Sequence, residues 1–183
     1  MDNPDKTIKK EVSVPYALYE SEKGDYFIGQ TPILTGGNQH ALAALENPSH
    51  SHVNVYVNAI TVTNLSELNV SSEFYLRSTF DYGITSNSVS CANLAINPAP
   101  TPEAKIKYVT TAAQPPKDGV AIFSRIVSPY STLVIDGGQI ILSPGQSLVV
   151  YLGGLLPVAP NSTIVAFGWW EENVCGCCDC CCK

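Results

Sequence analysis

The clearest pattern along the chain is an alternation of apolar and polar side chains over residues 53–63. One set of alternate positions carries Val53, Val55, Val57 and Ala59, and the intervening set carries asparagines and a tyrosine. Successive side chains of a β-strand point to opposite faces, so this stretch predicts a strand with one apolar, core-facing side. We expect the other side to be a polar or interfacial surface.

Shorter runs of strand-forming residues recur along the rest of the chain, separated by turn signals rich in Gly, Pro and Asn. One of these signals, residues 136–138, is expected to be a hairpin turn. No convincing amphipathic helix is expected. About eight to ten short strands at this spacing predict an all-β fold, an antiparallel two-sheet β-sandwich with jelly-roll-like connectivity. The other expected strands are 26–29, 40–45, 73–77, 105–109, 120–127, 131–135, 139–142, 147–152 and 163–170.

Composition divides the chain into three parts: an N-terminal arm at 1–25, a β-sandwich domain at 26–172 and a Cys-rich tail at 173–183. The arm is polar and charged, which is typical of a frayed terminus. It also holds several large apolar residues, which favour a strand that pairs with the sheet edge of a neighbouring subunit. The candidate subunit-interface residues of the arm are Val12, Val14, Tyr16, Leu18 and Tyr19.

Charge is scarce, since only 14% of the residues are charged, and the net charge is −6. Such a surface is either buried against neighbours or filled by Ser, Thr and Asn. Nucleic-acid binding needs basic stripes and is not expected, and an anionic membrane surface is unsuitable for the same reason. No membrane-spanning run and no secretory signal are found, so we expect a chain made in a cytosol and not exported by the usual route.

The end of the chain concentrates its sulfur, because six of the seven cysteines lie within residues 175–183. Adjacent cysteines bridge each other only with strain, since their Cα atoms lie about 3.8 Å apart and a disulfide needs about 4.4–6.8 Å. In an extended tail three thiols point to each side, so the tail could cross-link one subunit to two neighbours. The rival interpretation is a thiolate cluster for Zn²⁺ or Cu⁺. The tail cysteines are Cys175, Cys177, Cys178, Cys180, Cys181 and Cys182.

Catalytic signatures are missing from the sequence, which has neither a nucleophile elbow nor a P-loop. We therefore expect no enzyme, no cofactor and no metal site in the body. His50 and His52 precede a strand as in cupin metal motifs, but the Glu and the third His of such a site are missing. Glu171 and Glu172 point to opposite faces of a strand, so we expect them to solvate its end rather than share a substrate.

Trp169 and Trp170 are adjacent on an expected strand, so one ring should face the core and the other should face outward. We take Trp170 as a candidate anchor of a subunit interface. A sugar-stacking platform and a second buried ring under a covering arm are the two alternatives.

Several blocks of the body resemble an uncharacterised domain family of spore-forming bacteria of the Bacillus, Paenibacillus and Clostridium groups, over residues 24–172. The blocks are 26–32, 47–49 with 53–58, 123–127, 144–148 and 166–172. The resemblance implies no assigned activity. It implies a spore-surface or extracellular setting without a classical signal peptide, where oxidation follows lysis of the mother cell. By fold-level analogy, spore appendages are built from β-sandwich subunits joined by arms and disulfides.

The expected function is a non-enzymatic structural subunit that self-assembles into a spore- or cell-surface fibre or layer. The arm would add a strand to a neighbour, and the tail would form disulfides. Cys91, in the expected loop 81–104, is the one body thiol that the tail might reach. The expected partners are further copies of the chain and other spore-surface proteins. The alternative is a metal- or sugar-binding β-sandwich module with the tail as a thiolate metal site.

Overall fold

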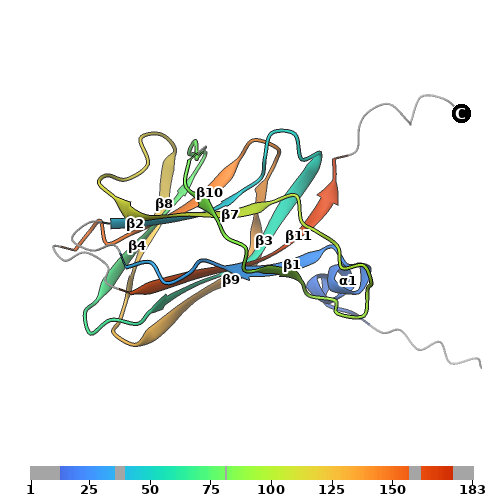
Figure 1. Ribbon diagram of the computed structural model, residues 1–183, viewed down its shortest axis with the longest axis horizontal. Coiled ribbons are helices and arrows are strands. Elements are labelled where there is room, and N and C mark those ends of the chain that lie inside the picture. Colours follow the sequence, from blue (N-terminus) through green and yellow to red (C-terminus); the bar gives the residue numbers. More distant parts are fainter. Residues whose placement is uncertain (1–12, 36–39, 81, 157–161, 175–183) are drawn as a thin grey trace, which may run out of the picture.

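The structure, a computed structural model, describes residues 13–35, 40–80, 82–156 and 162–174. These residues form one helix and eleven strands (Figure 1). In chain order they are α1 (Tyr16–Lys23), β1 (Tyr26–Gln30), β2 (His40–Glu46), β3 (Val53–Asn64), β4 (Val70–Leu76), β5 (Ile84–Thr85), β6 (Val89–Cys91), β7 (Lys105–Ala112), β8 (Val120–Val127), β9 (Ser131–Leu142), β10 (Ser147–Leu152) and β11 (Thr163–Asn173).

The strands form two antiparallel sheets that pack face to face. Sheet A has the order β6-β1-β11-β3-β9, and sheet B has the order β5-β7-β2-β10-β4-β8. The first and second halves of the chain pair in nested order: β4 with β8, β3 with β9, β2 with β10 and β1 with β11. One long hairpin wound into two sheets produces this nesting, which is jelly-roll connectivity. The predicted all-β sandwich is confirmed, and β5–β7 form an insertion between β4 and β8.

The core lies between the two sheets and consists of their inward-facing side chains. Strand β3 contributes Val55, Val57, Ile60 and Val62, all of them buried. The alternation reverses at Asn58, where the register against both neighbouring strands shifts. Ala59 therefore does not share a face with the three valines before it, which corrects the sequence-based assignment. A β-bulge moves every later residue to the opposite face.

The predicted hairpin at residues 136–138 is wrong. Residues Ser131–Leu142 form one strand, β9, along the edge of sheet A. Gly137 has φ 128°, a conformation that glycine adopts without steric cost. Val57 lies opposite Ile140 and Ala59 lies opposite Asp136, so the Gly-Gly signal marks a bulge within the strand rather than a reversal.

The arm holds a helix where no helix was expected. Helix α1 ends at Gly24, whose φ of 91° and N–H bonds to Glu20 and Ser21 cap the helix. Tyr16, Leu18 and Tyr19 therefore lie on a helix rather than on an added strand. Two short strands, β5 and β6, also interrupt the expected loop 81–104. No helix among the described residues is long and apolar enough to span a membrane.

Candidate functional site

Helix α1 docks on the C-terminal end of β11 through an aromatic contact, which we call the junction (Tyr16, Tyr56, Trp170 and Glu172). The Tyr16 ring meets Trp170 edge-on at 5.5 Å between centroids, and Trp170 stacks on Tyr56 at 5.2 Å. The Tyr16 hydroxyl donates to Glu172 Oε1 at 2.7 Å, and Trp170 Nε1–H donates to the same oxygen at 3.3 Å. Trp170 and Glu172 are two residues apart on one strand, so their side chains lie on the same face. This spacing is the sequence pattern that could have predicted the contact.

Trp170 is only 7% exposed, because the arm and Tyr56 cover it. The two interpretations that need an outward ring, an exposed interface anchor and a sugar-stacking platform, are therefore corrected for the folded chain. The arrangement in the structure is the third one, a second buried ring under a covering arm. The neighbouring ring of Trp169 is fully buried in the core, against Phe27.

Glu171 is buried on the other face of β11 and accepts three hydrogen bonds. The backbone N–H groups of Glu103 and Ala104 donate to its two oxygens at 2.9 Å each, and Trp169 Nε1–H donates at 2.9 Å. The two glutamates thus point to opposite faces, as predicted. The expectation that both solvate the strand end is wrong for Glu171, which anchors the segment leading into β7. Its oxygens are occupied by structural bonds, so it is no free general base.

Electrostatics tighten the junction from both sides. The hydrogen bond from Tyr16 lowers the pKa of Glu172, and the same bond raises the pKa of Tyr16. On α1, Lys23 lies 2.7 Å from Glu20 and 3.1 Å from Asp25, and these hydrogen bonds raise the pKa of Lys23. The bond from Tyr16 to Glu172 therefore holds α1 to β11, while the ion pairs of Lys23 lie within α1 and the residues that directly follow it.

The junction places the arm (1–25) and the tail (173–183), which we call the connectors, at the same end of the sandwich. The described chain enters α1 at Tyr16, and it leaves β11 at Asn173, next to Glu172. Val174 N–H then donates to the His52 carbonyl at 2.8 Å, which holds the last described residue against the body. Figure 1 shows α1 and the end of β11 at the same side of the molecule. The arm and the tail therefore attach at one end, not at opposite ends.

The predicted interface residues of the arm surround this end. Val14, Tyr16, Leu18 and Tyr19 are between 44% and 54% exposed. Their exposure leaves them available to a neighbour, and their interface role stays a prediction. Val12 and the six tail cysteines lie outside the described residues.

Cys91 lies in β6 and is only 3% exposed. Its thiol lies 3.5 Å from the Gly24 carbonyl, and Cys91 pairs with Phe27 across the β6–β1 ladder. A disulfide needs both sulfur atoms in direct contact, so Cys91 cannot reach a partner unless β6 opens. Its burial in the core corrects its assignment as a cross-linking thiol of the folded body.

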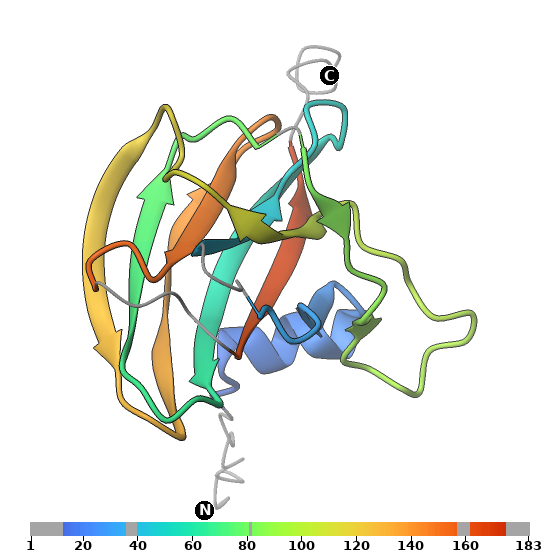
Figure 2. The same cartoon turned by 60° about the vertical axis from the view of Figure 1, so that its left-hand side comes forward.

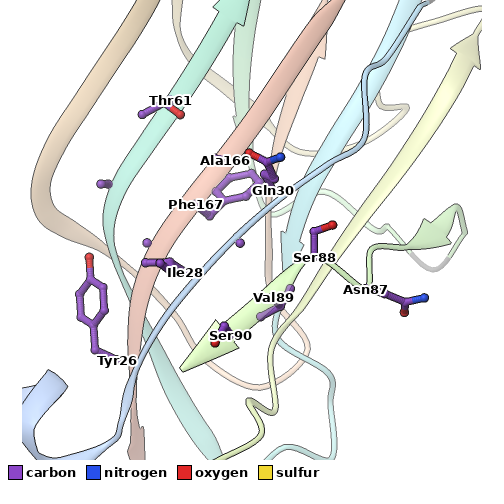
Figure 3. Close-up of a pocket in the computed structure, with 13 residues that line it drawn as sticks. Tyr26, Ile28, Gln30, Thr61, Asn87, Ser88, Val89, Ser90, Ala166 and Phe167 are labelled. Atoms are coloured by element: carbon purple, nitrogen blue, oxygen red, sulfur yellow. The ribbon is translucent and has the colours of Figure 1, made fainter. Parts of the chain in front are cut away.

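A second feature is a trough of about 640 Å³ on the outer face of sheet A (Figure 3). The trough is hollowed out because Gly168, Ala166 and Ala59 present little or no side chain. A Cβ on Gly168 would lie 2.6 Å from the Tyr26 hydroxyl. Ile28, half-exposed, stands within it. No Asp, Glu, Lys or Arg lines the trough, so it offers a neutral surface without an acid–base pair.

Metal ligands do not gather in the part of the chain that the structure describes. No group of three or more His, Cys, Asp or Glu side chains that could hold a metal ion is found in those ranges. His50 and His52 have no third ligand there. The thiolate alternative concerns the tail, which lies outside these ranges.

Comparison with known proteins places the chain in a family without supplying an activity. No curated protein and no solved structure matches it. A family of unknown function, DUF6143, matches residues 1–176. This match is longer than the sequence blocks indicated, since it includes the arm and ends at Gly176, within the Cys-rich tail. The chain therefore belongs to the family of unknown function DUF6143.

Proposed function

We propose that this chain is a non-enzymatic structural subunit that self-assembles into a surface fibre or layer. The observation that carries the proposal is the shared exit of the two connectors, joined by the bond from Tyr16 to Glu172. An arm and a cysteine-rich tail at one end give that end two means of holding a neighbour: non-covalent contact and disulfide bonds. A connection from this end to a different surface of the next subunit is head-to-tail, and it generates an open assembly where its rotation does not close into a ring.

The body supports this proposal because its polar side chains serve the fold. Glu171 and Glu172 accept hydrogen bonds from the chain itself, and Cys91 is enclosed in the core. The charged share of the sequence is low, at 14%, which suits a surface that is covered by neighbours. The body thus acts as a stable block that carries connectors.

The proposed setting is the spore or cell surface of a Gram-positive bacterium, in line with the resemblance of the body to domains of spore formers. The proposed partners are further copies of the chain and other spore-surface proteins. Disulfides do not persist in a reducing cytosol. The tail would therefore cross-link after lysis of the mother cell exposes it to oxidant.

Three forms of the full-length protein test the proposal: the wild type, a variant with all six tail cysteines changed to Ser, and a variant lacking residues 2–12. Cys91→Ser serves as the matched control, because it removes one thiol and leaves the tail intact. We expect oxidised wild type and Cys91→Ser to form large assemblies in light scattering. Assemblies of the tail variant should lack disulfide cross-links and fall apart on dilution. The deletion of residues 2–12 should reduce the yield of assemblies. A wild type that stays monomeric after oxidation would refute the proposal.

The same samples decide the metal alternative. Elemental analysis of protein purified without oxygen would find stoichiometric zinc or copper if the tail were a metal site. The structural proposal predicts less than one zinc or copper ion per chain. Metal that is present in the wild type and lost from the tail variant would favour the binding module instead.

A further inference from the structure

A pocket of about 550 Å³, which we call the α1 pocket, opens beside the junction between α1 and the end of β11. Its aromatic side chains are Tyr16 and Tyr19 of α1 and Phe27 of β1. The loop 92–104 contributes two further lining residues. Figure 2 shows this loop, in yellow-green, beside α1, in blue. The α1 pocket therefore lies at the end of the sandwich where the connectors attach.

The lining of the α1 pocket carries a surplus of negative charge. Four acidic residues and one basic residue line it, which leaves a formal charge of −3. The basic residue is Lys23, whose ammonium is already paired with two of the acids. The carboxylate of Glu171 is also satisfied, by three N–H groups of the chain. The four acidic residues are Glu20, Asp25, Glu171 and Glu172.

Glu20 indicates that a partner is missing from this pocket. Its side chain is only 1% exposed, and its Oε2 accepts a 2.7 Å hydrogen bond from Lys23. Its Oε1 is also buried, but it has no hydrogen-bond partner among the described residues. A buried carboxylate oxygen without a donor is costly, and folded proteins satisfy nearly all such atoms. The pocket therefore lacks a donor that the described part of the chain does not supply.

The nearest hydroxyl cannot fill this need. The pKa of Tyr16 is raised chiefly by the hydrogen bond to Glu172, and Glu20 raises it further, so the tyrosine lies near both carboxylates. Its single proton is donated to Glu172. A primary ammonium brings three N–H donors and a full positive charge. Tyrosine rings also attract cations, as Lys23 shows at 5.4 Å from the centre of the Tyr19 ring.

The chain itself contains a segment with the required chemistry. Lys9-Lys10 is the only adjacent pair of basic residues in the sequence, and it lies in the arm. Residues 13–15, the part of the arm that leads into α1, are exposed, and none of them lines the α1 pocket. A fully extended segment of twelve residues, such as 1–12, spans up to about 40 Å. These observations favour the arm of a neighbouring copy as the occupant.

We propose that the α1 pocket binds the ammonium group of Lys9 or Lys10 from the arm of a second copy of this chain. The ammonium donates to Glu20 Oε1 and offsets the charge of Glu172, next to the rings of Tyr16 and Tyr19. The inference rests on the proposed function, because it specifies how the arm of one subunit holds the next. The contact is then an ion pair in a pocket rather than an added strand.

Sedimentation velocity of the full-length protein, kept reduced so that disulfides do not contribute, tests the pocket. Glu20→Gln removes the charge and keeps the size of the side chain. Glu22→Gln is the matched control, because Glu22 is an exposed acid of the same helix and does not line the pocket. We expect the reduced wild type to associate, and Glu20→Gln should raise the dissociation constant at least about tenfold. Glu22→Gln should leave it unchanged.

The arm is tested in the same way. Lys9→Gln combined with Lys10→Gln should also raise the dissociation constant at least about tenfold. Lys117→Gln combined with Arg125→Gln is the matched control, because it removes two exposed positive charges outside the pocket. A synthetic peptide of residues 1–12 should compete with association of the wild type, and the same peptide with both lysines changed to Gln should not. If Glu20→Gln loosens α1, the arm variant and the peptide decide the outcome.

Mixing distinguishes the arm of a neighbour from the arm of the same chain. The Glu20→Gln variant keeps an intact arm, and the Lys9→Gln, Lys10→Gln variant keeps an intact pocket. An equimolar mixture should therefore associate more tightly than either variant alone. A mixture that associates no better would overturn the second copy as the occupant.

The remaining outcomes separate this inference from the proposed function. Unchanged association of both test variants, or equal weakening by their controls, would overturn the pocket as the arm's binding site. A wild type that is monomeric when reduced but assembles when oxidised would also overturn it, and would leave the proposed function standing. A wild type that is monomeric in both conditions would overturn both.

Discussion

The hydroxyl of Tyr16 donates a 2.7 Å hydrogen bond to Glu172, a residue 156 positions later in the chain. This bond joins the first helix of the chain to its last strand. Tyr16 lies within the arm, at the start of α1, and Glu172 lies three residues before the first tail cysteine. The arm and the tail are therefore neighbouring connectors, and a subunit bound at this end can meet both.

Loss of the Tyr16 hydroxyl should loosen α1 without unfolding the sandwich. We expect Tyr16→Phe to keep the ring contact with Trp170 and to increase opening of α1 by about two- to fivefold, because a single half-exposed bond is lost. Hydrogen exchange at residues 16–23 measures this opening. Tyr19→Phe, on the same helix and 49% exposed, is the control. Equal protection of α1 in both variants would show that the Tyr16 bond does not hold the arm.

The junction should weaken in acid. The hydrogen bond from Tyr16 lowers the pKa of Glu172 below its usual 4.5, so its stabilising effect is complete above that value. The effect is lost as the pH falls through the lowered pKa. We expect Trp170 fluorescence to report release of α1 below about pH 4.5. Glu172→Gln, which does not titrate, should flatten this dependence, and an identical profile in that variant would contradict the assignment.

At high pH the docking of α1 depends on Tyr16, whose pKa is raised chiefly by its hydrogen bond with Glu172. Its contribution is present below its usual pKa of 10 and is lost as the pH rises through the raised value. Docking of α1 should therefore persist across neutral pH. Release of the helix between pH 6 and 8 would not fit a junction built on these two groups.

Removal of the Glu171 carboxylate should cost more than removal of the Glu172 carboxylate at the junction. Three N–H groups donate to this buried side chain, and Glu171→Ala would leave them without an acceptor. We expect a loss of about 3 kcal/mol in the free energy of unfolding, measured in urea. Glu172→Ala, on the outer face of the same strand, should cost less. Equal losses in the two variants would mean that Glu171 has no special role.

Cys91 should resist alkylation in the folded protein, because it is 3% exposed and packed against β1. Mass spectrometry after treatment with a maleimide should find Cys91 unmodified in native protein and modified in denaturant. The tail cysteines, which lie in a separate peptide, provide the internal reference. Rapid native labelling of Cys91 would restore it as a cross-linking thiol.

Much of the fold could be predicted from the sequence, because period-2 patterns report directly which faces are buried. Residues 53–57 alternate in this way, and their strand forms as expected. Residues 147–152 form the other kind of strand, a continuous apolar run that is buried on both faces. Pro and Gly signals separated the strands correctly in most places. The Gly-Gly pair at 137–138 was misleading, since a bulge and a hairpin use the same residues. Only the opposite bulge at Asn58 distinguishes them, and that pairing is long-range.

The junction could not be predicted from local pattern. Helix α1 is short, and its stability depends on Tyr16 meeting Trp170 across most of the chain. A local signal did exist, since Lys23-Gly24 resembles a helix end, but eight residues without an apolar stripe give it little weight. The role of Glu171 was likewise hidden, because its partners at 103–104 are backbone groups that any sequence supplies.

Negative-stain microscopy of the full-length protein, oxidised and then treated with reductant, tests the central claim most directly. The account predicts extended fibres or layers after oxidation, which reductant breaks down to small particles. Deletion of residues 2–12 should shorten the oxidised assemblies. Particles of one or two subunits under both conditions would contradict a self-assembling structural role.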